Sequence, residues 1–77
     1  MPPPRLPALR PKDILRALEH AGFFVHHQTG SHVQLKHAAK PTLRVTVPAH
    51  TYDVPRGTLQ NILRQAELTA EEFQKLL

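Results

Sequence analysis

Four of the six histidines in this chain fall within twelve positions, in the segment "HHQTGSHVQLKH" that spans residues 26 to 37 around Gly30 and Ser31. An imidazole exchanges a proton near neutral pH and is also a common metal ligand. Three interpretations of the segment are therefore open: a catalytic base, a metal site, or the ordinary chemistry of a turn.

The acid–base interpretation centres on His32. His32, Gln34 and Lys36 alternate with Val33 and Leu35, which predicts a strand with one polar face that carries an accessible imidazole. RNA is a matching substrate, because the 2′-hydroxyl beside each phosphate attacks that phosphate once a base removes its proton. The products are a cyclic phosphate and a free 5′-hydroxyl, and neither a metal nor a cofactor is required.

The charge that develops on such a phosphate needs a cation or an N–H group nearby. Local candidates are the amides of Gly30 and Ser31 and the side chains of Lys36 and Arg44. Each also has an ordinary interpretation. Glycine and serine are common turn residues, and lysine, arginine and His32 itself fit the solvated side of a half-buried sheet.

A metal site is the weaker alternative. Its ligands would come from five histidines and one acid: His26, His27, His32, His37, His50 and Asp53. Neighbouring strand residues point to opposite faces, so at most one of the adjacent pair joins His32, and zinc needs three or four converging ligands. A hydrolytic Ser31–His32 pair is weaker still, because successive strand residues diverge and no orienting acid lies at a telling spacing. We therefore expect no bound metal.

Strict alternation also divides the aromatic and histidine side chains of the first strand. It places Phe24 and His26 on the same polar face as His32, and Phe23 and Val25 on the other. His27 should then point away from that face or lie at a strand edge, and His37 lies where the apolar stripe ends. Packing at the sheet edge would explain Phe24 equally well.

The elements that position these residues follow from hydrophobic periodicity. Residues 11–21 predict an amphipathic helix that ends at Gly22; residues 23–29, 32–37 and 42–47 predict three antiparallel strands; and residues 58–68 predict a second helix, capped by Thr58 or Gly57. Thr69 and Glu72 form a capping box for a short last helix with Phe73, Leu76 and Leu77. The prediction is an α+β fold with both main helices on one face of the sheet.

Length and charge limit the function. The 77 residues predict a single domain over residues 11–77, without a deep cavity, behind a loose proline-rich leader over residues 1–10. Residues 1–66 carry nine Lys or Arg against three acids, a balance that favours a polyanionic partner. No cysteine, no secretory signal and no apolar run of about 20 residues is present, which favours a cytoplasmic protein without a membrane partner.

Three blocks of the sequence together resemble the HicA-type (YcfA-like) mRNA interferases, the toxins of HicA/HicB toxin–antitoxin systems. The blocks are "GFFVHHQTGSHVQL", "VTVPAH" and "RGTLQNILRQAELTAEEF", and the similarity covers roughly residues 11 to 74. The resemblance implies a double-stranded-RNA-binding-domain-like fold. It also implies ribosome-independent cleavage of mRNA, with His32 as the catalytic residue, and a HicB-type antitoxin as partner.

The match has further consequences for individual residues. His50 corresponds to the histidine of the family's Pro-x-His segment and is a candidate for RNA binding with Gly30, Ser31, Lys36 and Arg44. Two positions depart from the family: His27 stands where arginine is usual, and Glu67 where glycine is usual. Besides a ribonuclease toxin, the sequence is compatible with a noncatalytic RNA-binding module that uses the same basic face, and with a protein-interaction domain that binds an acidic partner.

Overall fold

The computed structural model describes residues 8–50 and 52–77. The chain forms α1 (Pro11–His20), β1 (Phe23–Thr29), β2 (His32–His37), β3 (Arg44–Pro48), α2 (Arg56–Ala66) and α3 (Ala70–Gln74). The strands make one antiparallel sheet in the order β1-β2-β3. The predicted α+β order of helix, three strands, helix and short last helix is confirmed.

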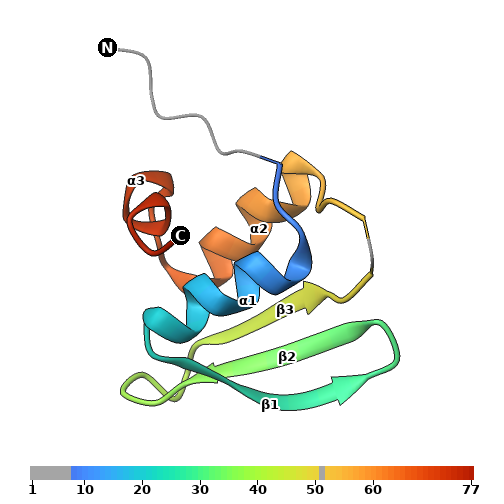
Figure 1. Ribbon diagram of the computed structural model, residues 1–77. Helices are drawn as coiled ribbons and strands as arrows, with labels where there is room; N and C mark the ends of the chain where they lie inside the picture. The colour runs from blue at the N-terminus through green and yellow to red at the C-terminus, as the bar shows by residue number, and fades with distance from the viewer. Residues whose placement is uncertain (1–7, 51) are drawn as a thin grey trace.

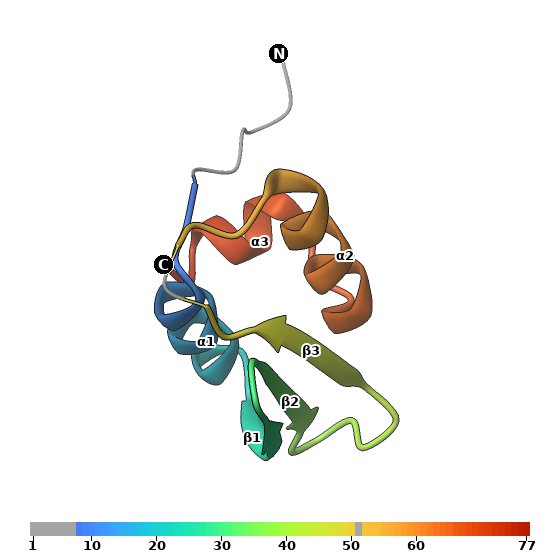
Figure 2. The same cartoon turned by 90° about the vertical axis from the view of Figure 1, so that its right-hand side faces the viewer.

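The helices cover one side of the sheet and leave the other side open (Figures 1 and 2). α1 lies against β1 and β3, and α2 lies against β3. Between these layers lies the core, whose fully buried members come from every layer: Ile14, Leu18, Leu35, Val45, Val47, Leu59, Ile62 and Phe73. Alternation along β2 and β3 supplies the sheet's contribution, as predicted, because every second side chain faces the helices.

β1 is an edge strand that the helices cover only at its beginning. Phe23 is buried, whereas every residue from Phe24 to Thr29 is exposed. β3 is the other edge strand. There a side chain of α2 binds an unpaired backbone group, because Gln65 Oε1 accepts the Thr46 N–H at 3.0 Å. The two edges therefore differ: one is held by a helix, and the other is open to solvent.

The predicted cap of α2 is wrong, and the predicted cap of α3 is confirmed. α2 begins at Arg56 with Pro55 at its N-cap, so neither Gly57 nor Thr58 caps it; Pro55 already supplies an extended backbone that enters the helix. The capping box of α3 is confirmed, with Thr69 Oγ1 accepting the Glu72 N–H at 3.0 Å and Glu72 Oε1 accepting the Thr69 N–H at 2.9 Å.

The chain before α1 is joined to the segment that follows β3. The Val54 N–H donates to the Leu9 carbonyl oxygen at 2.8 Å, and Leu9 packs against the core. Residues 1–7 of the predicted leader lie outside the described residues. No helix in the described part of the chain is both long enough and apolar enough to span a membrane.

Candidate functional site

The side of the sheet that faces away from the helices is polar and basic, and we call it the open face. Strand register fixes its members, because directly opposed residues of antiparallel strands project from the same side. His32 pairs with Thr29 and Pro48, Gln34 with His27 and Thr46, and Lys36 with Phe24 and Arg44. All of these side chains are exposed except Lys36 and Pro48, which are half-buried.

A β-bulge in β1 changes the predicted distribution of the histidines. Val25 pairs with Leu35, but the next pair is His27 with Gln34, so His26 is an extra residue. The bulge shifts the alternation by one position and brings His27 onto the open face. His26 lies there too, lining a hollow with Gln34 and Lys36. Of the two predicted alternatives for His27, pointing away from the open face is wrong, because strict alternation does not anticipate an inserted residue. The other alternative, a position in an edge strand, is confirmed by the strand order.

His32 is the first residue of β2, directly after the turn. Gly30 adopts the left-handed φ of 53° that this turn requires, and a Cβ there would meet no atom within 4 Å. The imidazole of His32 is exposed and makes no hydrogen bond to any residue that the structure describes. Its ring nitrogens are therefore accessible for proton exchange with a ligand on the open face.

The segment after β3 lies beside this turn. The Ala49 N–H donates to the Ser31 carbonyl oxygen, which extends the pairing of β2 with β3 past His32 and Pro48. His50 follows, and its ring is held in place: Nδ1 lies 2.9 Å from the Tyr52 carbonyl oxygen, and the ring stacks on Tyr52 with centroids 3.7 Å apart. Because a carbonyl only accepts, Nδ1 donates this hydrogen bond, and Nε2 is left for another partner.

The predicted site residues thus fall into two groups. Gly30, Ser31 and His32 lie at the turn, next to the segment that carries His50. Lys36 and Arg44 pair with each other four residues further along β2. At the rise of a β-strand this separation is about 13 Å. One phosphate in contact with His32 does not extend over that distance, since hydrogen bonds are about 3 Å long.

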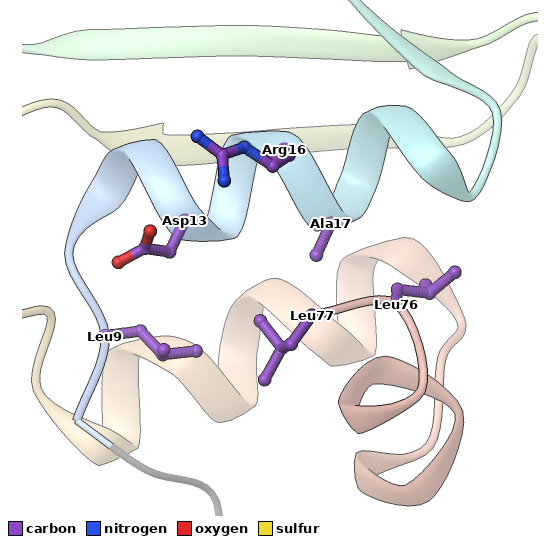
Figure 3. A pocket seen from close by; sticks show the side chains of 6 residues that line it. All are labelled: Leu9, Asp13, Arg16, Ala17, Leu76 and Leu77. Atoms are coloured by element: carbon purple, nitrogen blue, oxygen red, sulfur yellow. The ribbon is translucent and has the colours of Figure 1, made fainter.

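A hollow of roughly 280 Å³ lies at the Lys36 end of the open face. Besides Leu35 and Val45, it is lined by residues with polar or charged side chains: His26, Gln34, Lys36, Arg44 and Thr46. Strict alternation already placed His26 on this face, and the structure confirms that it lines the hollow. A second, largely apolar hollow between α1 and the end of the chain contains none of the predicted site residues (Figure 3).

His37 has a structural role that the sequence did not indicate. Its Nδ1 accepts the N–H groups of Ala39 and Lys40 at 3.0 and 3.1 Å, so the proton must lie on Nε2, which donates to the Ala21 carbonyl oxygen at 2.9 Å. The ring also contacts Phe23 edge-on, with centroids 4.8 Å apart. With both nitrogens engaged, His37 joins the end of α1 to the β2–β3 loop and is not available to a substrate.

No group of three or more His, Cys, Asp or Glu side chains in residues 8–50 and 52–77 is arranged to hold a metal ion. The bulge brings His26 and His27 to the same face, yet His37 lies on the helix-covered side and His50 is oriented by Tyr52. The histidine-rich segment is therefore distributed over separate environments.

Comparison with known families places this architecture. The profile described as "HicA toxin of bacterial toxin-antitoxin" matches residues 11–68, from the start of α1 to just beyond α2. The chain belongs to the HicA toxin family. Comparison with curated proteins finds no match. The matched region contains the whole sheet, both main helices and every candidate site residue. The open face therefore lies within the part of the chain that matches the HicA family.

Proposed function

We propose that this HicA-family chain is an mRNA endoribonuclease toxin that cuts RNA independently of the ribosome and of metal ions, with His32 as its catalytic residue. The observation that carries the proposal is the state of that side chain: exposed, without a hydrogen bond to a described residue, and on a face with Lys36 and Arg44. A cytoplasmic location follows from the substrate.

In this mechanism His32 removes the proton of a ribose 2′-hydroxyl. The 2′-oxygen forms a bond to phosphorus while the bond from phosphorus to the 5′-oxygen breaks, and the leaving 5′-oxygen takes up a proton from the imidazolium or from water. The amides of Gly30 and Ser31 lie at the turn that precedes His32, and we assign to them the backbone hydrogen bonds to the charged phosphate. His50, whose Nδ1 is held by the Tyr52 carbonyl oxygen, supports RNA binding there through Nε2.

The partner in this proposal is a HicB-type antitoxin that covers the open face. A face with several cations, which no element among residues 8–50 and 52–77 covers, suits an acidic or anionic partner, and RNA and antitoxin would then compete for it. Addition of the antitoxin should therefore stop cleavage and displace bound RNA together. Inhibition while RNA stays bound would contradict a shared surface.

The test is the chemistry of the products. Purified protein should cleave RNA oligonucleotides, with and without a chelator, and leave a 2′,3′-cyclic phosphate on one product and a 5′-hydroxyl on the other. A single 2′-deoxy substitution at the cut nucleotide should block this cleavage. His32→Ala should abolish cleavage, while His20→Ala, an exposed histidine on α1, should retain it. Cleavage by His32→Ala, or of the deoxy substrate, would overturn the mechanism.

A noncatalytic RNA-binding module is the second candidate, and one observation favours it. The cations at Lys36 and Arg44 lie about 13 Å along the strand from His32, so they form a binding surface of their own. For such a module, the wild-type protein should bind RNA with a strong salt dependence and leave it intact.

A further inference from the structure

A row of three side chains crosses the open face at the end away from His32. Phe24 on β1 pairs with Lys36 on β2, and Lys36 pairs with Arg44 on β3. Opposed residues project from one face, and neighbouring strands lie about 4.7–4.9 Å apart, so the row is about 10 Å wide. It consists of one aromatic ring followed by two cations.

The ring of Phe24 is exposed in a way that packing does not explain. It is 46% exposed, whereas Phe23 beside it is 4% exposed and belongs to the core. Phe24 stacks on no other ring in the described part of the chain. An aromatic side chain on a basic sheet face is a surface on which an unpaired base can stack.

The polar hollow adjoins this row and supplies hydrogen-bonding groups. Lys36 and Arg44 both line it, together with Gln34, Thr46 and His26. A guanidinium binds phosphate oxygens in a bidentate manner, and a lysine ammonium adds a point charge. No described acidic side chain lines the hollow. Its chemistry therefore suits a phosphate next to the ring.

We propose that Phe24, Lys36 and Arg44 form a nucleotide subsite for single-stranded RNA, in which a base stacks on Phe24 and its phosphate binds Lys36 and Arg44. Because this subsite lies about 13 Å from His32, the nucleotide bound there is not the one that is cut; this part rests on the proposed function of His32. A single strand is required because neighbouring bases cover both faces of each base within a duplex.

The first experiment measures binding without cutting. The probe is a fluorescein-labelled single-stranded RNA that is 2′-O-methylated throughout, so that it lacks the attacking hydroxyl. Phe24→Ala and Phe24→Leu should each weaken its affinity by about 5- to 150-fold, the range for loss of a stacking aromatic. Val25→Ala is the matched control, because Val25 is 48% exposed on the same strand and should bind like the wild type.

Phe24→Leu keeps most of the apolar volume, so it separates stacking from folding. If this variant folds as judged by circular dichroism and binds as tightly as Val25→Ala, the stacking role is overturned. It is equally overturned if the wild-type protein does not bind the methylated strand, or if a duplex of the same sequence competes as well as the single strand does.

The cations are tested by salt dependence. Arg44→Gln should reduce the slope of log affinity against log salt concentration by about 0.7, the value for one phosphate contact in a single strand. Arg64→Gln, an exposed arginine on α2, is the control and should keep the wild-type slope. Equal slopes for the two variants would remove Arg44 from the subsite.

These results are separable from those for His32. A protein that binds the methylated strand through Phe24 but cuts no unmethylated RNA fails the proposed function and retains the subsite. A protein that cuts RNA while Phe24→Leu leaves affinity and KM unchanged retains the proposed function and loses the subsite.

Discussion

Strand β2 begins with His32 and ends with His37, and these two histidines show how the open face differs from the helix-covered side. His32 projects from the open face and has no hydrogen bond to a described residue. His37 lies on the covered side, where both ring nitrogens are engaged and the ring packs edge-on against Phe23. The same side chain is free at one end of a six-residue strand and fixed at the other.

The difference shows that partners, and not residue type, decide what a histidine does. In His37 both ring nitrogens already have hydrogen-bond partners, so the ring stabilises the fold and cannot exchange a proton with a substrate. A ring that faces solvent keeps that ability and contributes little to stability. Changes on the open face should therefore alter activity, and changes on the covered side should alter stability.

His32→Ala should produce the largest effect. Loss of a general base lowers a rate constant by about 10²- to 10⁴-fold. An exposed side chain that bonds to none of the described residues should change the free energy of unfolding by less than about 0.5 kcal/mol. Single-turnover RNA cleavage and urea unfolding measure the two quantities. A large stability loss with little change in rate would reverse the assignment of the two faces.

His37→Ala should give the opposite pattern. It removes the bond to Ala21, two N–H acceptor contacts and the ring contact with Phe23. The N–H groups of Ala39 and Lys40 are exposed and can bind water instead, so we expect a loss of about 2 kcal/mol in unfolding free energy. At a temperature where the variant is folded, RNA cleavage should stay near the wild-type rate; a rate loss like that of His32→Ala would contradict the comparison.

A pair of glycine substitutions tests the same contrast, because Gly22 lies against His37 and Gly30 lies in the turn before His32. A Cβ on Gly22, whose φ is 102°, would lie 2.7 Å from His37 Nε2, whereas a Cβ on Gly30 would meet nothing within 4 Å. Gly22→Ala should therefore cost about 2 kcal/mol and Gly30→Ala about 1 kcal/mol, the latter from backbone conformation alone. Thermal unfolding of both variants tests the order, and equal losses would show that His37 moves aside without cost.

Glu67→Gly should raise stability on the covered side and leave the open face unchanged. Glu67 ends α2 with a left-handed φ of 57°, and the Leu68 N–H donates to the Leu63 carbonyl oxygen at 3.0 Å in the pattern of a Schellman motif. Glycine avoids the steric cost of this conformation but loses more entropy on folding, so the net gain should be about 0.5 kcal/mol. Chemical unfolding tests the gain in stability, and a cleavage assay tests whether the open face is unchanged. A changed cleavage rate would show that the helix-covered side and the open face of the sheet are coupled.

The smallest effect concerns acid and the cap of α3. The hydrogen bond from the Thr69 backbone N–H, followed by that with the Thr69 side chain, lowers the pKa of Glu72 below 4.5. A lowered carboxyl pKa means that the stabilisation is fully present above the unfolded-state value and is lost as the pH falls through the folded-state value. The difference in unfolding free energy between wild type and Glu72→Gln should therefore shrink below about pH 4.5. A difference that stays constant with pH would show that the carboxylate charge is not involved.

Much of this molecule follows from short-range patterns in the sequence. Period-two alternation along the predicted strands 32–37 and 42–47 indicated which side chains of β2 and β3 enter the core, because successive strand residues must face opposite sides. The Thr69–Glu72 spacing likewise determined the start of α3. The polar character of the open face, with His32, Gln34, Lys36 and Arg44, could therefore be predicted without coordinates.

Only the tertiary structure decided what happens where strands and loops meet. The bulge at His26 depends on how β1 pairs with β2, so it moved His27 onto the open face against simple alternation. The bonds of His37 join atoms from α1 and the β2–β3 loop. The ring of Phe24 projects from the open face and is 46% exposed, which decides between the open-face position and the edge packing that alternation had left equally possible. Local periodicity fixes the direction of a side chain along one strand, whereas its partners come from segments that only folding brings together.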